Sequence, residues 1–154
     1  MIYNVILQRI MAKIEKAYDY IEHTADTGVI ASGKTLEQVF VNCALGMLNL
    51  ITDLESIGNM VTKEVLVNAG DNNFETLLIE WLNELLYIYD VDRTVFSTFD
   101  IISLNPGSLS ARCSGEKIDH SRHIIKTEIK AATYHMLSIT KTNGLYRAQV
   151  IFDM

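Results

Sequence analysis

Hydrophobic residues recur at helical spacing in two segments of the chain. In the first segment, Thr35 precedes the run and Gln38 follows three residues later, which is the pattern of a capping box. The apolar positions after this cap are Leu36, Val39, Phe40, Cys43, Met47, Leu50 and Ile51. Residues at this spacing share one face of a helix. The pattern predicts a helix that begins after Thr35 and ends near Thr52.

The second helical segment follows the break "GDNN", in which Asp71 or Asn72 can act as the N-terminal cap. Its apolar stripe is wide and consists of Phe74, Leu77, Leu78, Trp81, Leu82, Leu85, Leu86 and Tyr89. The opposite face carries Glu75, Glu80, Asn83 and Glu84. The pattern predicts an amphipathic helix with an acidic outer face.

The remaining hydrophobic runs alternate with polar residues or are rich in β-branched residues, as strands are. The predicted strands are residues 17–22, 27–33, 61–68, 94–104, 108–115, 124–133, 136–141 and 145–153. The resulting order is β-β-α-β-α-β-β-β-β-β, with the helices early, the strands late and no regular βαβ alternation. This order predicts the α+β class. We expect a two-layer fold in which both helices pack on one face of a mostly antiparallel sheet.

The composition is that of one folded domain. The chain has 154 residues, of which 49% are hydrophobic and 21% are charged, and a chain of this kind can bury one substantial core. We expect residues 17–154 to form a single domain. Residues 1–16 precede the first predicted strand and contain a second methionine, Met11. We expect them to be an N-terminal extension that is disordered in part.

The net charge and the two cysteines indicate which binding partners and which compartment to expect. The formal net charge is −6 and the Lys and Arg residues form no cluster, which argues against tight, direct binding of nucleic acid. No apolar run reaches the length of about 18 residues that a membrane-spanning helix needs. Cys43 and Cys113 belong to no CxxC pair. We therefore expect free thiols in a reducing compartment, the cytoplasm.

The junction between the first two predicted strands carries unusual chemistry for a hairpin. It has the sequence "EHTADTG" and contains His23 and Asp26. These side chains are suited to be a ligand pair or an acid–base pair. The alternative is a polar strand connection in which Asp26 accepts hydrogen bonds from backbone N–H groups.

The chain closes with "VIFDM", so that Asp153 follows an apolar strand. It is either a solvated carboxylate or, if the last strand lies beside the first, a neighbour of Asp26. Two carboxylates with backbone carbonyls form an all-oxygen site that suits Ca²⁺ or Mg²⁺. Because two close negative charges repel, a cation or a lysine is expected between them. Strand alternation puts Lys130 on the same face as Glu128 and Tyr134, where it can serve that purpose or remain an exposed charge.

Several signatures of enzymes are absent. His123 and His135 do not match the spacing of zinc ligands, and the sequence contains no P-loop, GxGxxG, GxSxG or HExxH motif. The residues alone therefore indicate an α+β domain with carboxylates suited to a cation site.

The motifs taken together resemble the archease family. They are "YDYIEHTADTG", "GKTLEQVF", "ITD", "LLIEWLNELLYIYD", "RHIIKTEIKAATYH" and "VIFDM", in this order between Tyr18 and Asp153. The sequence departs from the family pattern at Ile129, where valine is commoner, and in its first residues. The resemblance covers nearly the whole chain after the extension.

This resemblance implies a protein cofactor and not an enzyme with a small-molecule substrate of its own. Archeases are accessory factors of the RtcB-type RNA ligase, which joins RNA ends in tRNA splicing and repair. The ligase is activated by guanylylation of a histidine with GTP and Mn²⁺, and archease promotes this step and repeated turnover. The implied partner is therefore an RtcB-type RNA ligase.

The resemblance also implies site residues. It assigns a divalent cation, Ca²⁺ or another hard cation such as Mg²⁺ or Mn²⁺, to Asp26, Asp153 and Met154. Lys130 matches a family lysine that is important for ligase activation.

His23, His123 and Glu128 are further candidates for the site. Two other functions stay open: a chaperone-like modulator of a tRNA-modifying enzyme such as a tRNA methyltransferase, and a metal-dependent hydrolase that uses His23 with the two aspartates.

Overall fold

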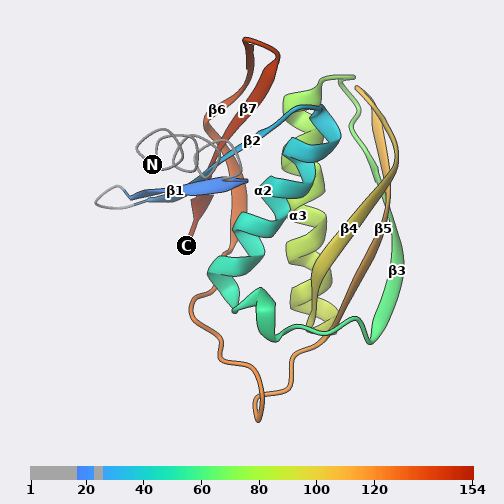
Figure 1. Ribbon diagram of the computed structural model, residues 1–154, viewed down its shortest axis with the longest axis vertical. Coiled ribbons are helices and arrows are strands. Elements are labelled where there is room, and N and C mark those ends of the chain that lie inside the picture. Colours follow the sequence, from blue (N-terminus) through green and yellow to red (C-terminus); the bar gives the residue numbers. More distant parts are fainter. Residues whose placement is uncertain (1–16, 23–25) are drawn as a thin grey trace, which may run out of the picture.

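Two helices lie between two antiparallel β-sheets in the computed structural model, which describes residues 17–22 and 26–154 (Figure 1). The elements in chain order are β1 (Tyr18–Glu22), β2 (Thr27–Gly33), α2 (Leu36–Ile51), the 3-10 helix η1 (Leu54–Ser56), β3 (Val61–Asn68), α3 (Phe74–Asp92), β4 (Thr94–Asn105), β5 (Ser108–Lys117), β6 (Ala131–Thr142) and β7 (Leu145–Asp153). The predicted extension, residues 1–16, lies outside the described residues. No helix in the described part of the chain is long and apolar enough to span a membrane.

The sheets have the strand orders β1-β2-β7-β6 and β3-β5-β4, and all pairs are antiparallel. The α+β class is thereby confirmed. Both helices pack on one face of each sheet: α2 contacts β2 and β4, and α3 contacts β6 and β3. The α+β class holds, but the expected two layers with one sheet are replaced by three layers: the described strands form two sheets, and the helices are a shared middle layer. The wide apolar stripes of the helices explain this arrangement, because they can cover an apolar face on each side.

The first helix begins and ends where its sequence pattern predicts. Thr35 is the N-cap of α2 and its Oγ1 accepts a hydrogen bond from the Gln38 N–H at 3.2 Å. The Gln38 side chain reaches back one residue further than a capping box requires and accepts from the Lys34 N–H at 2.8 Å. Thr52 caps the other end. Local capping chemistry is thus sufficient to define this helix.

The cap of the second helix differs from the prediction. Neither Asp71 nor Asn72 is the N-cap of α3; Asn73 is, and its Oδ1 accepts from the N–H of Glu75 at 2.7 Å. Asn72 has a left-handed backbone with φ of 52°, whereas an N-cap residue is extended. Asp71 supports the same turn from outside, because its Oδ2 accepts from the Thr76 hydroxyl at 2.7 Å.

The predicted strand 124–133 is wrong over most of its length. Only its last residues belong to a strand, since β6 begins at Ala131 and runs on to Thr142. The preceding segment is tied to the end of α2 instead of to a neighbouring strand. The Lys126 N–H donates to Ile51 O at 2.7 Å and the Thr52 hydroxyl donates to Ile124 O at 2.8 Å. The described part of the chain therefore has one strand fewer than predicted.

The core is formed by the helix stripes and the inner faces of both sheets. Trp81 is completely buried at its centre, and its Nε1 donates to Phe40 O of the other helix at 3.1 Å. Phe99 of β4 packs edge-on against the Trp81 ring. Along β7 the residues alternate, so that Val150 and Phe152 are buried in the core. Asp153 is exposed.

Candidate functional site: a corner of the β1-β2-β7-β6 sheet

The pairing of β2 with β7 brings the two predicted carboxylates to the same corner of the sheet. The ladder ends with the pair Thr27–Phe152, so that Asp26 and Asp153 are the next residue on each side. Directly opposed residues of an antiparallel pair lie close together and on the same face. If the ladder continued by one pair, the two carboxylates would lie on the face that is turned away from the helices.

Strand β6 adds Lys130 to this corner from the other side of β7. Ala131 pairs with Asp153, and the N–H of Lys130 donates to Asp153 O at 2.8 Å. Asp26, Lys130 and Asp153 are all exposed. We call these three residues, together with Met154, the β7 corner. Three residues that are far apart in the sequence are thus neighbours along the backbone of adjacent strands.

A bulge in β6 adds a histidine that the sequence pattern did not place at the site. The β6–β7 register shifts between Thr133 and Ser138. Met136 has a φ of 54°, and its carbonyl oxygen accepts from Gln149 Nε2 at 2.9 Å. His135 and Met136 line a depression of about 110 Å³ together with Asp26 and Ile151. A bulge of this kind re-aims side chains beside a functional site, which simple alternation cannot predict.

The donor set at the β7 corner fits a hard divalent cation. Within residues 17–22 and 26–154, no group of three His, Cys, Asp or Glu side chains is arranged to hold a metal ion. The side chains therefore supply two carboxylates, and further ligands would be backbone oxygens, such as that of Met154, and water. Ca²⁺ and Mg²⁺ accept carboxylate, carbonyl and water oxygens, whereas zinc prefers His and Cys.

His123 has a different environment from the β7 corner. It is 2% exposed, and its Nδ1 accepts from the Asp119 N–H at 2.9 Å. Nε2 therefore carries the proton and donates toward Glu116 Oε1 at 3.0 Å and Ser56 O at 3.1 Å. The ring anchors the 118–130 loop to β5 and η1.

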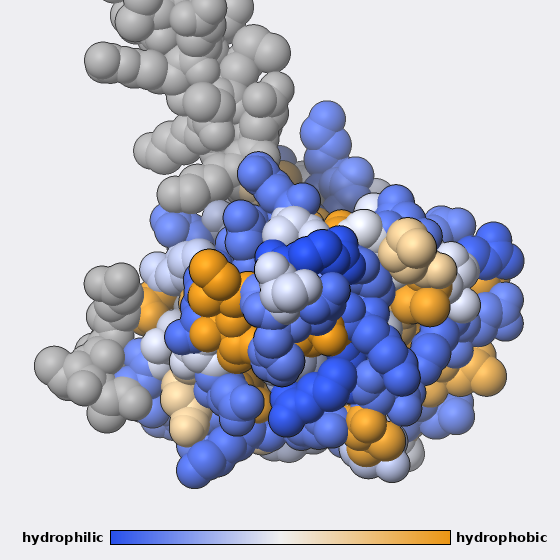
Figure 2. All heavy atoms as spheres, turned by 90° about the horizontal axis from the view of Figure 1, so that it is seen from below, coloured by the Kyte–Doolittle hydropathy of each residue, from blue (hydrophilic) through white to orange (hydrophobic). Residues whose placement is uncertain are grey.

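Glu116 gives this anchor its charge. Its carboxylate contacts Arg122 at 2.6 Å. The hydrogen bonds from Arg122, and then from the Gly58 N–H, lower the pKa of Glu116 to about 2. Figure 2 views the end of the molecule that carries this loop; hydrophilic residues predominate there and the hydrophobic residues form separate groups.

Glu128 contributes less to the geometry of the site. Glu128 is exposed and lies 3.9 Å from Arg93, a separation at which an exposed ion pair contributes little. His23 lies outside the described residues.

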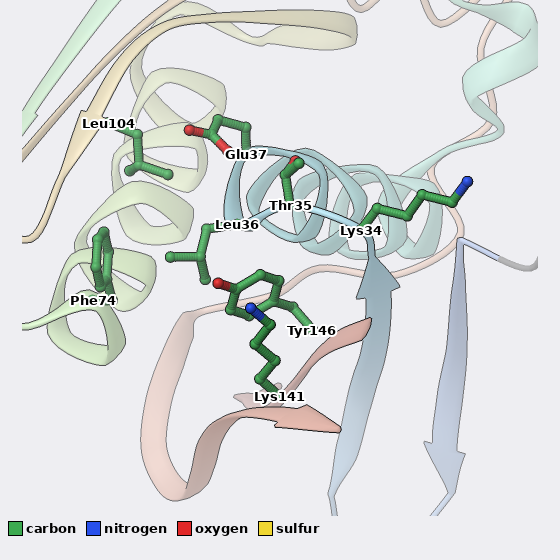
Figure 3. A pocket seen from close by; sticks show the side chains of 8 residues that line it. All are labelled: Lys34, Thr35, Leu36, Glu37, Phe74, Leu104, Lys141 and Tyr146. Carbon is green, nitrogen blue, oxygen red and sulfur yellow. The ribbon is translucent and has the colours of Figure 1, made fainter. Parts of the chain in front are cut away.

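A larger depression, of about 380 Å³, lies at the other end of β7 (Figure 3). It is lined by Lys34, Thr35, Leu36, Glu37, Phe74, Leu104, Lys141 and Tyr146. The Lys141 ammonium lies 4.9 Å from the centre of the Tyr146 ring, and in Figure 3 Lys34 is directed away from Phe74 and Leu104. Tyr146 is near the start of β7 and Asp153 is at its end. This depression is therefore separate from the β7 corner.

The fold and the corner define an α+β domain with two helices between antiparallel sheets. Comparison with known proteins identifies the family: residues 18–154 match the Archease protein family (MTH1598/TM1083). The chain belongs to the archease family.

Curated relatives agree with this assignment over nearly their full length. Protein archease of Methanosarcina mazei is 43% identical over 143 residues, which are 90% of this chain and 97% of the relative. Protein archease of Sulfolobus acidocaldarius is 35% identical, over 89% of this chain and 98% of the relative. The assignment therefore does not depend on one relative.

Two solved structures have the same fold. The solution structure of protein 1598 of Methanobacterium thermoautotrophicum has a TM-score of 0.74 at 33% identity and covers 90% of this chain and 99% of its own. The crystal structure of a Thermotoga maritima archease, described as a possible chaperone, has a TM-score of 0.59 at 22% identity, over 87% and 94% of the two chains. The second likeness supports the fold alone.

Proposed function

We propose that this protein is a cofactor that activates an RtcB-type RNA ligase by promoting its GTP-dependent guanylylation and its repeated turnover. The process served would be tRNA splicing and RNA repair. The observation that carries the proposal is the strand order β2-β7-β6, which gathers Asp26, Lys130 and Asp153 at one corner. These are the residues that the family resemblance assigns to a cation and to ligase activation.

The β7 corner has the chemistry to act in a nucleotide pocket of a partner. Asp26 and Asp153 would hold a divalent cation through their carboxylates, with Met154 contributing a backbone oxygen. Such a cation, when bound, supplies positive charge to phosphate oxygens. Lys130 is exposed beside Asp153, and its ammonium would offset further phosphate charge. The protein would thus act by positioning and electrostatics, with the reacting histidine on the ligase.

The overall charge is consistent with this division of labour. The net charge of −6 without a basic cluster is unfavourable for holding RNA by its phosphates. In the proposed complex the ligase binds the RNA and the GTP. This protein would contact the nucleotide pocket of the ligase only through the β7 corner.

Variants that remove one charge each test the proposal. We expect Asp26→Asn, Asp153→Asn and Lys130→Ala to stimulate transfer of labelled GMP from GTP to the ligase much less than the wild-type protein does. The positions are exposed, so the free energy of unfolding should change by only about 0.5 kcal/mol. Titration calorimetry with Ca²⁺, Mg²⁺ and Mn²⁺ should show weaker binding to the two aspartate variants.

Matched controls come from the exposed residues outside the corner. Asp100→Asn on β4 and Lys126→Ala in the 118–130 loop remove the same kinds of charge and should stimulate normally. Normal stimulation by all three corner variants would refute the assignment of the site. A wild-type protein that does not change ligase guanylylation would refute the function.

The alternative function is that of a chaperone-like modulator, a role that the description of the Thermotoga maritima archease as a possible chaperone also suggests for that protein. In that case the protein would modulate a tRNA-modifying enzyme such as a tRNA methyltransferase. Co-purification and stimulation, measured side by side with the ligase and the methyltransferase, distinguish the two functions. Turnover of phosphoester substrates by the isolated protein with a divalent cation would instead indicate a hydrolase.

A further inference from the structure

Asn83, in the middle of α3, makes an unusual pair of hydrogen bonds to the beginning of strand β6. Its Oδ1 accepts from the Ala132 N–H at 2.8 Å, and its Nδ2 donates to Ala132 O at 3.2 Å. A carboxamide that binds both backbone groups of one residue imitates a neighbouring β-strand. We propose that Asn83 is a positioning residue for the β7 corner, an inference that rests on the proposed function of that corner.

The place of Ala132 in the sheet explains why these bonds are needed. Among the strands of residues 17–22 and 26–154, β6 is at the edge of its sheet and β7 is its only strand neighbour. The Lys130 N–H points to β7, where it donates to Asp153 O. The backbone groups of Ala132 point the other way, toward α3. Ala132 is 5% exposed, so water has little access, and without Asn83 its N–H and C=O would lose their partners.

Asn83 therefore determines where β6 begins. The preceding segment, residues 118–130, has no regular secondary structure and is tied to α2 through Thr52 and Lys126. Between these ties and the regular part of β6 lies Lys130. The carboxamide holds the backbone two residues beyond it. With Ala132 held on one side and Asp153 on the other, the Lys130 backbone is fixed relative to both.

The sequence of α3 supports a dedicated role. Asn83 is half-buried and lies beside the apolar stripe of α3, between the buried residues Leu82 and Leu85. Asparagine is a poor helix former because its side chain competes for backbone hydrogen bonds. Here both polar ends of the side chain are used by another element. The amide in the "WLNELL" motif is thus explained by its contact with β6.

The chain offers a closely matched control in Asn42. This residue lies in the middle of α2, and its Nδ2 donates to Ser32 O of β2 at 2.7 Å. It is also a half-buried helical asparagine that binds a strand backbone. Ser32 pairs with Arg147, at the opposite end of the β2–β7 ladder from the β7 corner. If Asn83 has only a structural role, Asn42→Ala and Asn83→Ala should therefore have the same effect on stimulation of the ligase.

Amide hydrogen exchange, followed by NMR on the full chain, tests the positioning directly. We expect Asn83→Ala to speed exchange at Ala132 and Lys130 by about tenfold, the effect of losing one hydrogen bond. Amides of the β3-β5-β4 sheet should keep their protection. Asn42→Ala should leave Ala132 and Lys130 unchanged. Asn83→Leu, which keeps the side-chain volume, should repeat the effect of Asn83→Ala.

The same variants are then compared in ligase guanylylation. We expect Asn83→Ala and Asn83→Leu to lower the maximal stimulation by about tenfold or more, because small displacements of a functional group are costly. The protein concentration that gives half of the maximal effect should change little. Asn42→Ala should match the wild type in both quantities.

The outcomes separate this inference from the proposed function. Unchanged exchange at Ala132 and Lys130, or stimulation by Asn83→Ala equal to that by Asn42→Ala, would overturn the role of Asn83 even if Lys130→Ala abolishes stimulation. If the wild-type protein does not stimulate the ligase, the proposed function fails. The exchange measurement still decides in that case whether Asn83 positions Lys130.

Discussion

Replacing Gly28 with alanine should force β2 away from β7 beside the β7 corner. Gly28 pairs with Ile151, two residues from the Asp26–Asp153 positions. A Cβ at this position would lie 2.6 Å from Ile151 Cδ1 and 2.7 Å from Val150 O. The first contact can be relieved by rotation of the Ile151 side chain. The second cannot, because the Val150 carbonyl belongs to the backbone of the central strand.

The cost can be estimated from these contacts. Non-bonded carbon atoms prefer separations of about 3.5–4.0 Å, so β2 must shift by several tenths of an ångström. Overpacking a well-packed site costs about 1–3 kcal/mol. For a domain of this size, a loss of about 2 kcal/mol lowers Tm by about 4–8 °C. The shift also separates Asp26 from Asp153, and stimulation of the ligase should fall with it.

Thermal unfolding followed by circular dichroism measures the stability effect, and Gly70→Ala is the control. A Cβ at Gly70 would meet no heavy atom within 4 Å, so that this variant should stay within about 0.5 kcal/mol of the wild type. If Gly28→Ala unfolds at the same temperature as Gly70→Ala, the close approach of β2 to β7 described here is wrong. If Gly28→Ala is clearly less stable but still stimulates the ligase normally, the packing of β2 against β7 is not required for the function.

Two further predictions concern the buried network and the thiols. Because the pKa of Glu116 is lowered from 4.5 to about 2, its contribution to stability is present above its ordinary pKa and is lost as the pH falls toward 2. Urea unfolding at a series of pH values should therefore show a steeper loss on acidification for the wild type than for Glu116→Gln, and parallel curves would contradict this reasoning. Burial raises the pKa of Cys43 and of Cys113 to about 12, so a thiol reagent at pH about 8 should label neither in the native protein and both in urea. Fast labelling of a native thiol would show that one of these sites opens.

Local patterns in the sequence determined the helices and most strands. The Thr35–Gln38 cap and the apolar spacing of α2 act within a few residues, so the predicted bounds are confirmed. The cap of α3 was missed by one residue because several polar residues compete there, and backbone conformation selects Asn73. The segment 124–130 has strand-like alternation, but its hydrogen bonds go to the end of α2. Alternation of apolar and polar residues indicates that one side of a segment is buried. It does not indicate which segment its backbone bonds to.

The candidate site was only partly accessible from the sequence. Repulsion between two close carboxylates suggested that Asp26 and Asp153 need a cation or a lysine if they meet, and the family resemblance named the same residues. Their meeting depends on the position of β7 between β2 and β6, and the roles of His135 and Asn83 depend on a bulge and on an open strand edge. Spacing along the chain encodes which residues are buried, because that choice is local. The tertiary structure alone decides which strand lies beside which, because backbone hydrogen-bonding groups are the same in every residue and acquire particular partners only when the elements pack.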